Sequence, residues 1–215
     1  MIASPAVSID KYEVTRMKVI ETHYNGYRFR SRLEARWAVF FDTLGVRYEY
    51  EPEGFELDDG TWYLPDFRVK CYGTRGEFDS EPFDLYIEVK GHMSEKDAHK
   101  IRMFSRTADL YDTDHDRDYY EAIVPVLIVG SIPNVNNVYD VTDSFILGSY
   151  NRMDGIEIYP CNYETIDGDY FAAYPAATRD GHFYLMGDDS SYINSWDLDR
   201  VLRAYNKAKA ARFER

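Results

Sequence analysis

Two short apolar segments of the chain carry charged residues at positions where a buried strand would normally be hydrophobic. The first segment, residues 63–67, contains Asp66, and the second, residues 85–91, contains Glu88 and Lys90. An unpaired carboxylate or ammonium is costly to bury, so a buried strand tolerates one only where something compensates it. We therefore expect these three side chains to lie together at the ends of neighbouring strands, where they can compensate one another and hold a divalent metal ion.

The composition is typical of a soluble globular protein. Of the 215 residues, 45 % are hydrophobic and 29 % are charged, and the 20 tyrosines argue against disorder. No apolar run approaches the roughly 18 residues of a membrane span, and the first residues lack the basic segment of a secretory signal. The two cysteines, Cys71 and Cys161, form no CxxC motif. We expect a cytoplasmic protein with reduced thiols and no membrane association.

The net charge of −13 is concentrated in one part of the chain. Residues 109–199 carry 18 acids and only 3 bases, whereas four arginines cluster within residues 28–36. Nucleic-acid-binding proteins usually present a basic surface, so the overall acidity argues against that class while leaving room for a local basic patch. Three interpretations of the acidic block stand: a solvated surface, a docking surface for a basic protein partner, or a face that repels nucleic acid.

Hydrophobic periodicity predicts strands and helices that alternate through residue 130. Apolar residues at three- and four-residue spacing predict helices over 31–44 and 94–110. The Asn25-Gly26 pair and residues 58–60 are hairpin-turn signals, the second within a hairpin over 55–64, and residues 70–83 are expected to form a loop. The predicted strands are 10–23, 27–29, 46–51, 65–69, 84–89 and 123–130.

Beyond residue 130 the pattern changes to short strand candidates between turns rich in Asp, Gly and Asn. A last helix is expected over 195–212, with Ser195 as its N-cap. The sequence thus predicts an α/β protein with a core over residues 1–130. Residues 131–215 are expected to form a small, acidic, β-rich appendage whose terminal helix packs on the core.

The spacing within the second charged segment indicates how a metal could be bound. Glu88 and Lys90 are two residues apart, so both side chains point to one face of a strand, and the carbonyl of Val89 between them is a further candidate ligand. Mg²⁺ prefers a few carboxylates and keeps several waters. Such an ion can activate water and neutralise charge during phosphodiester hydrolysis. Asp66, Glu88 and Val89 are therefore the candidate metal ligands, and Lys90 is the candidate for orienting or deprotonating the attacking water.

Pro65-Asp66 followed by Glu88-Val89-Lys90-Gly91 resembles the motif of the PD-(D/E)XK nuclease superfamily. The predicted order of helix, Pro-Asp hairpin, Glu-x-Lys strand, helix and strand over about residues 24–130 is similar to the restriction-endonuclease-like core, a mixed β-sheet flanked by helices. Residues 27–37 and 203–214 also look similar to small nucleases of bacteriophages and their hosts.

The resemblance implies a Mg²⁺-dependent DNA endonuclease or nickase, in which Mn²⁺ can replace Mg²⁺. DNA is the expected substrate ahead of RNA, and a homodimer is one arrangement that would cut both strands. Many members place a further acid on the first helix, which assigns Glu34 a supporting catalytic role. Some relatives carry a Cys-rich zinc module after the core, but only Cys161 lies in that region here, so no zinc is expected.

The same residues have structural interpretations. Asp66 would also suit a turn or a helix cap, and Glu88 with Lys90 would suit a solvent-facing ion pair on an edge strand. Ser31-x-x-Glu34 is a capping box, which requires no catalysis, and both roles of Glu34 can hold at once.

Basic residues near the predicted site are candidates for phosphate contacts or plain solvated surface positions. They are Arg28, Arg30, Arg32, Lys96 and Lys100. The alternative function is a catalytically silent protein of the nuclease fold, whose acidic region docks a basic partner or mimics nucleic acid.

Overall fold

The structure of the chain is a computed structural model, which describes residues 20–72, 82–105, 126–133, 145–148, 157–160, 162–164, 170–187 and 195–213. Its helices are α1 (Arg32–Leu44), α2 (Glu95–Ser105) and α3 (Ser195–Ala210). The strands up to the second helix are β1 (Thr22–Tyr24), β2 (Tyr27–Phe29), β3 (Tyr48–Tyr50), β4 (Phe55–Glu56), β5 (Trp62–Tyr63), β6 (Phe67–Tyr72) and β7 (Phe83–Val89). The later strands are β8 (Val126–Val129), β9 (Phe145–Gly148), β10 (Glu157–Pro160), β11 (Asn162–Glu164), β12 (Tyr170–Ala177) and β13 (Phe183–Gly187).

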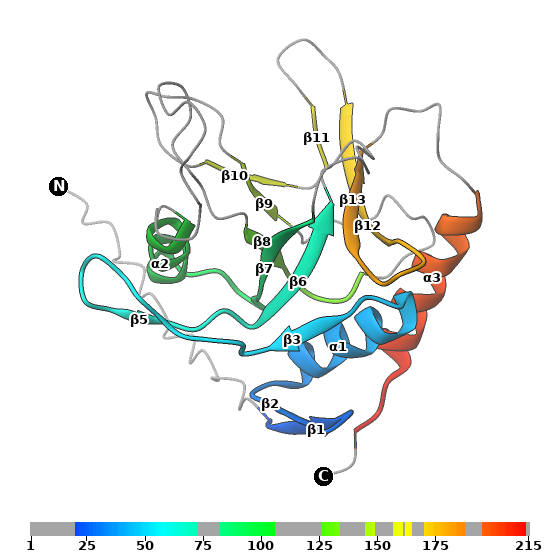
Figure 1. Ribbon diagram of the computed structural model, residues 1–215, viewed down its shortest axis with the longest axis horizontal. Helices are drawn as coiled ribbons and strands as arrows, with labels where there is room; N and C mark the ends of the chain where they lie inside the picture. The colour runs from blue at the N-terminus through cyan, green and yellow to red at the C-terminus, as the bar shows by residue number, and fades with distance from the viewer. Residues whose placement is uncertain are drawn as a thin grey trace, which may run out of the picture.

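One mixed sheet of nine strands dominates the fold (Figure 1). Its order is β10-β9-β8-β7-β6-β13-β12-β11, and β3 also pairs with β6. β6 and β7 are antiparallel, whereas β7 and β8 are parallel with α2 in the connection between them. Two small antiparallel sheets, β1–β2 and β4–β5, complete the arrangement. The mixed α/β class predicted from the sequence is therefore confirmed.

Helices cover the two faces of this sheet. Side chains of β7 alternate between the faces, so Ile87 packs in a cluster with α1 and α3 while Tyr86 packs in a second cluster with α2. On the first face, Phe40 of α1 stacks on Tyr205 of α3 with ring centroids 4.6 Å apart. On the second face, Phe104 of α2 meets Tyr86 edge-on at 5.1 Å. The central strands are therefore buried on both sides.

Helix α1 forms where its sequence pattern predicts it. Ser31 is the N-cap, and its hydroxyl oxygen accepts the Glu34 N–H at 3.1 Å. Gly45 ends the helix with a φ of 83°, a left-handed conformation that glycine adopts without a steric penalty. Its N–H donates to the carbonyls of Phe41 and Asp42. Both ends of α1 are thus fixed by local chemistry, which also fixes where the first turn of the helix lies.

The β6–β7 hairpin is longer than the sequence pattern indicated. The prediction ended the first strand at residue 69 and made 70–83 a loop, but β6 continues to Tyr72 and β7 begins at Phe83. The extension is stabilised by an ion pair of 2.7 Å between Lys70 and Asp84 and by burial of Cys71 on the opposite face. The prediction of a loop over all of 70–83 was therefore wrong at both ends, and residues 73–81 lie outside the described part.

Several other predicted segments fall partly or wholly outside the described residues. They are the start of the first strand (10–19), the end of the second helix (106–110) and the start of the strand at 123–125. Within the described part, no helix is long and apolar enough to cross a membrane.

Strands from both sides of residue 130 share the main sheet. β13 pairs in parallel with β6, and β9 pairs antiparallel with β8. Helix α3 lies beside α1 (Figure 1), and its Val201, Ala204 and Ala208 are buried in the same core cluster as α1. A division of the chain at residue 130 stays a prediction, and the sheet is continuous across it.

Candidate active site

Asp66 lies at the end of the sheet, immediately before β6 begins. The register pairs Phe67 with Ile87, so Asp66 stands opposite Glu88 on the neighbouring strand. Its Oδ2 atom accepts the Val89 N–H at 2.7 Å. The carboxylate thus takes the place that a backbone carbonyl would occupy if the pairing continued, which fixes the Asp66 side chain between the strands.

Glu88 is buried on the α2 face of β7, with 3 % of its surface exposed. Its Oε2 accepts a hydrogen bond of 2.7 Å from the Tyr63 hydroxyl, and its Oε1 lies 2.6 Å from the ammonium of Lys90. Lys90 follows the strand directly, and its N–H donates to the Val129 carbonyl on β8. The Lys90 side chain is more accessible, at 28 % exposed, so it stands between the buried acid and solvent.

Arg30 lies beside Asp66 in the connection between β2 and α1. Its Nη2 is 2.5 Å from Asp66 Oδ1, and its Nε is 2.6 Å from Glu51 Oε1. The Arg30 side chain is 53 % exposed, whereas that of Asp66 is 3 % exposed. Arg30 therefore joins the buried acid to the surface, as Lys90 does for Glu88.

Glu34 lies in the first turn of α1 and caps it. Its Oε1 accepts the Ser31 hydroxyl at 2.7 Å, and its Oε2 accepts the Tyr50 hydroxyl at 2.7 Å and the Arg30 N–H at 3.0 Å. The capping interpretation of Glu34 is confirmed, with the variation that its carboxylate reaches the N–H before the N-cap residue. The catalytic role of Glu34 stays a prediction.

The three carboxylates influence one another electrostatically. Burial and, after it, the negative charges of Glu88 and Glu34 raise the pKa of Asp66 to about 8, against the opposing effects of the Val89 N–H and Arg30. The negative charge in this site is thus only partly compensated by the two cations that touch it.

Lys90 stays charged in this environment. Burial lowers the pKa of Lys90, but the carboxylates of Glu88, Asp66 and Asp97 outweigh burial, so the net shift is upward. An ammonium of raised pKa is a poor proton acceptor at neutral pH. Of the two roles expected for Lys90, orientation of water and of anionic oxygens fits this environment better than deprotonation.

The donor set fits a hard divalent cation. Mg²⁺ commonly binds through one or two carboxylates and keeps its remaining waters. Asp66 and Glu88 supply the carboxylates, and the Val89 carbonyl leaves the strand on the same side as the N–H that meets Asp66. Among the described residues, no group of three Asp, Glu, His or Cys forms a ready metal cage. A cation at this place would therefore use two carboxylates, and it would displace Arg30 and Lys90 from them.

The other predicted phosphate contacts are dispersed. Arg28 lies on β2 and pairs at the surface with Glu21, and Lys96 is exposed on α2. Among the described residues, no hydrogen bond or ion pair joins Arg32, Lys96 or Lys100 to Asp66 or Glu88. Of the predicted basic residues, the structure brings only Arg30 into contact with the acidic pair, Asp66 and Glu88.

Sequence reasoning missed Tyr63 and Tyr50. Tyr63 is buried and donates to Glu88, and Tyr50 donates to Glu34. A tyrosine in an apolar segment looks the same whether its hydroxyl meets a carboxylate or water. The one available signal was that Tyr63 lies in the same segment as Asp66, on the arm of the β4–β5 hairpin that leads to it.

No family model, curated protein or solved structure matches this chain.

Proposed function

We propose that this protein is a Mg²⁺-dependent nuclease of the restriction-endonuclease-like fold that hydrolyses phosphodiester bonds in DNA. The observation that carries the proposal is the convergence of two buried carboxylates, Asp66 and Glu88, at one end of adjacent strands with Lys90 at their solvent side. The raised pKa of Asp66 supports it, because a cluster with uncompensated negative charge favours a divalent cation.

The order of the elements supports the fold assignment. Helix α1 precedes the antiparallel β6–β7 pair, and α2 then leads to β8, which lies parallel to β7. This order is similar to the core of the PD-(D/E)XK superfamily. The first turn of α1 comes to the same end of the sheet as Asp66, where Glu34 influences the pKa of that residue.

Asp66, Glu88 and the Val89 carbonyl would hold the metal, which supplies activation of water and neutralisation of charge on the phosphate when bound. Lys90 orients the attacking water and stabilises negative charge that develops on the phosphoryl oxygens. Arg30 is half-exposed beside Asp66, and its guanidinium can bind a phosphate in a bidentate manner. Both cations leave the carboxylates for these partners when the site is loaded.

The test is cleavage of supercoiled plasmid DNA in Mg²⁺ and in EDTA. Wild type should nick or linearise the plasmid only in Mg²⁺, and Asp66→Ala and Lys90→Ala should not. Lys207→Ala is the matched control, because Lys207 is exposed on α3. Equal cleavage by wild type and both site variants would overturn the assignment, as would a wild type that cleaves neither DNA nor RNA and binds no Mn²⁺.

A catalytically silent protein of this fold is the second candidate. It is favoured by one observation: each oxygen of Asp66 and Glu88 already has a partner within the chain, so the site is held together without a metal. This candidate predicts that the protein captures a stoichiometric basic partner and that Asp66→Ala and Lys90→Ala leave that capture unchanged.

A further inference from the structure

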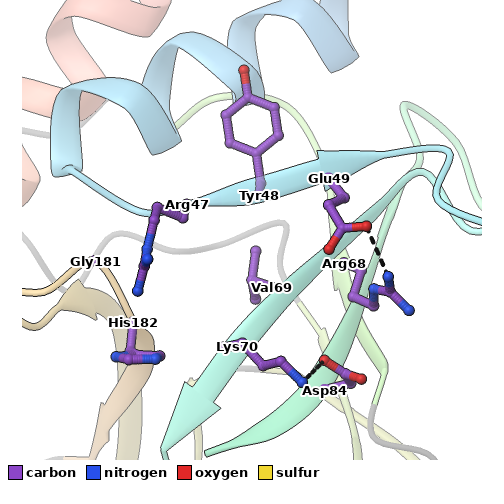
Figure 2. A pocket seen from close by; sticks show the side chains of 9 residues that line it. All are labelled: Arg47, Tyr48, Glu49, Arg68, Val69, Lys70, Asp84, Gly181 and His182. Carbon is purple, nitrogen blue, oxygen red and sulfur yellow. Dashed lines mark hydrogen bonds and ion pairs between the residues drawn. The ribbon is translucent and has the colours of Figure 1, made fainter.

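A pocket of about 290 Å³ opens beside β6, at the point where the strand paired with β6 changes from β3 to β13 (Figure 2). β3 pairs with β6 up to Val69, and β13 pairs with it from Cys71 onward. The two strands meet where the Arg47 N–H donates to the Gly181 carbonyl at 3.0 Å. β6 thus exchanges one neighbour for another at Lys70, and the pocket is lined by residues of β3, β6 and β7 and by the turn that precedes β13.

Gly181 permits the close approach of these segments. Its φ is +87°, and a Cβ atom at this position would lie 3.0 Å from the Gly45 carbonyl and 3.2 Å from the side chain of Arg47. The stem of Arg47 therefore packs against the backbone of this turn. In Figure 2 the Arg47 side chain points from the residue before β3 toward His182.

Cations outnumber carboxylates among the side chains that line the pocket. Arg68 is held by Glu49 at 2.7 Å and also by Glu53, so its charge is compensated. Lys70 lies 2.7 Å from Asp84, yet its side chain is 56 % exposed. Arg47 is exposed, and no carboxylate of the described residues forms an ion pair with it. Arg47 and Lys70 are therefore the cations that an anionic ligand can reach.

The pocket and the acidic pair share one face of β6. Phe67, Val69 and Cys71 are buried on the α1 face, so Asp66, Arg68 and Lys70 alternate onto the other. Four residues of a strand span about 13 Å at roughly 3.3 Å per residue.

We propose that this pocket binds a backbone phosphate of the DNA, about 13 Å along β6 from the bond cut at Asp66 and Glu88, through Arg47 and Lys70. The inference rests on the proposed function and adds to it a contact independent of base sequence. Asp84 acts against this binding, because its carboxylate holds Lys70 and repels the phosphate. Removing the two cations and removing the acid should therefore change DNA affinity in opposite directions.

The test is fluorescence anisotropy of a labelled DNA duplex in EDTA, titrated with the full-length protein at several salt concentrations. The double variant Arg47→Ala/Lys70→Ala should bind about tenfold more weakly, and the slope of log K against log salt should become shallower by about 1, because one phosphate contact is lost. Asp84→Asn should bind more tightly than wild type. Lys207→Ala, which also removes one exposed cation, should bind as wild type does.

The results separate this inference from the proposed function. If wild type cleaves plasmid in Mg²⁺ but the double variant keeps the affinity and salt slope of Lys207→Ala, the pocket assignment is overturned and the nuclease assignment stands. If wild type does not cleave DNA but the double variant loses affinity and Asp84→Asn gains it, the pocket assignment stands alone. Urea unfolding of each variant checks that weaker binding does not come from loss of folding.

Discussion

The hydroxyl of Tyr63 donates a hydrogen bond of 2.7 Å to Oε2 of Glu88, and both side chains are buried. Tyr63 belongs to the short β4–β5 hairpin, whereas Glu88 lies on a central strand of the main sheet. This bond therefore fixes the orientation of a proposed metal ligand from a separate element of the fold.

Tyr63→Phe should destabilise the protein by about 1–3 kcal/mol, because a buried carboxylate oxygen loses its donor. Urea unfolding measures the change. A double-mutant cycle with Glu88→Ala, which removes the acceptor, isolates the pair, and we expect the two losses to be less than additive. Fully additive losses would show that the bond does not hold Glu88 in place.

Two variants at the start of α1 separate the capping role of Glu34 from its proposed catalytic role. Ser31→Ala removes the N-cap and should cost about 1 kcal/mol of stability while leaving cleavage rates close to wild type. Glu34→Gln keeps an acceptor oxygen for the cap but removes the charge near Asp66. We therefore expect the cleavage rate to fall below that of Ser31→Ala, while stability changes little. Equal cleavage by the two variants would leave Glu34 with its capping role alone.

The pH dependence of stability should reveal the buried Asp66 carboxyl. Its pKa is about 8 in the folded protein against 3.8 ordinarily, so the folded state holds a proton that the unfolded state releases between these values. Stability contributed by this group is therefore present at low pH and is lost as the pH rises through that window. In EDTA, urea unfolding from about pH 5 to pH 8 should show a smaller loss for Asp66→Asn than for wild type. Parallel curves would contradict the assigned shift.

Lys90→Met should separate metal binding from catalysis. The substitution removes a cation that lies 2.6 Å from Glu88 Oε1 and competes for it, so Mn²⁺ affinity measured by calorimetry should stay equal or increase. Cleavage should fall by about 10²–10³-fold, because the ammonium no longer orients the attacking water or stabilises the developing negative charge. Cleavage within a few-fold of wild type would remove Lys90 from the mechanism.

The approach of Asp66 to Glu88 could be anticipated from sequence, because charged residues in two buried strands must compensate one another. The register could not, since a spacing of 22 positions does not say which residues stand opposite. The long hairpin escaped prediction for a related reason: Lys70 looks like a loop residue until its ion pair with Asp84, the first residue of the predicted strand, is seen.

The way the rest of the chain joins the sheet was also not predictable. The short strand at 183–187 has the pattern of an isolated appendage, yet it pairs in parallel with β6 through contacts more than a hundred residues apart. The pocket at Arg47 and Gly181 depends on this pairing. It could not be predicted, because neither residue has a neighbour in sequence that marks it. Local periodicity describes such elements but does not say which edge of the sheet they extend.

The central claim is that Asp66 and Glu88 hold a divalent cation, and anomalous diffraction from crystals soaked in Mn²⁺ tests it most directly. We expect one anomalous peak between the two carboxylates, with Arg30 and Lys90 moved away from them, and no peak at this place in Asp66→Ala. Crystals that diffract well and show no peak between Asp66 and Glu88 at saturating Mn²⁺ would contradict the claim.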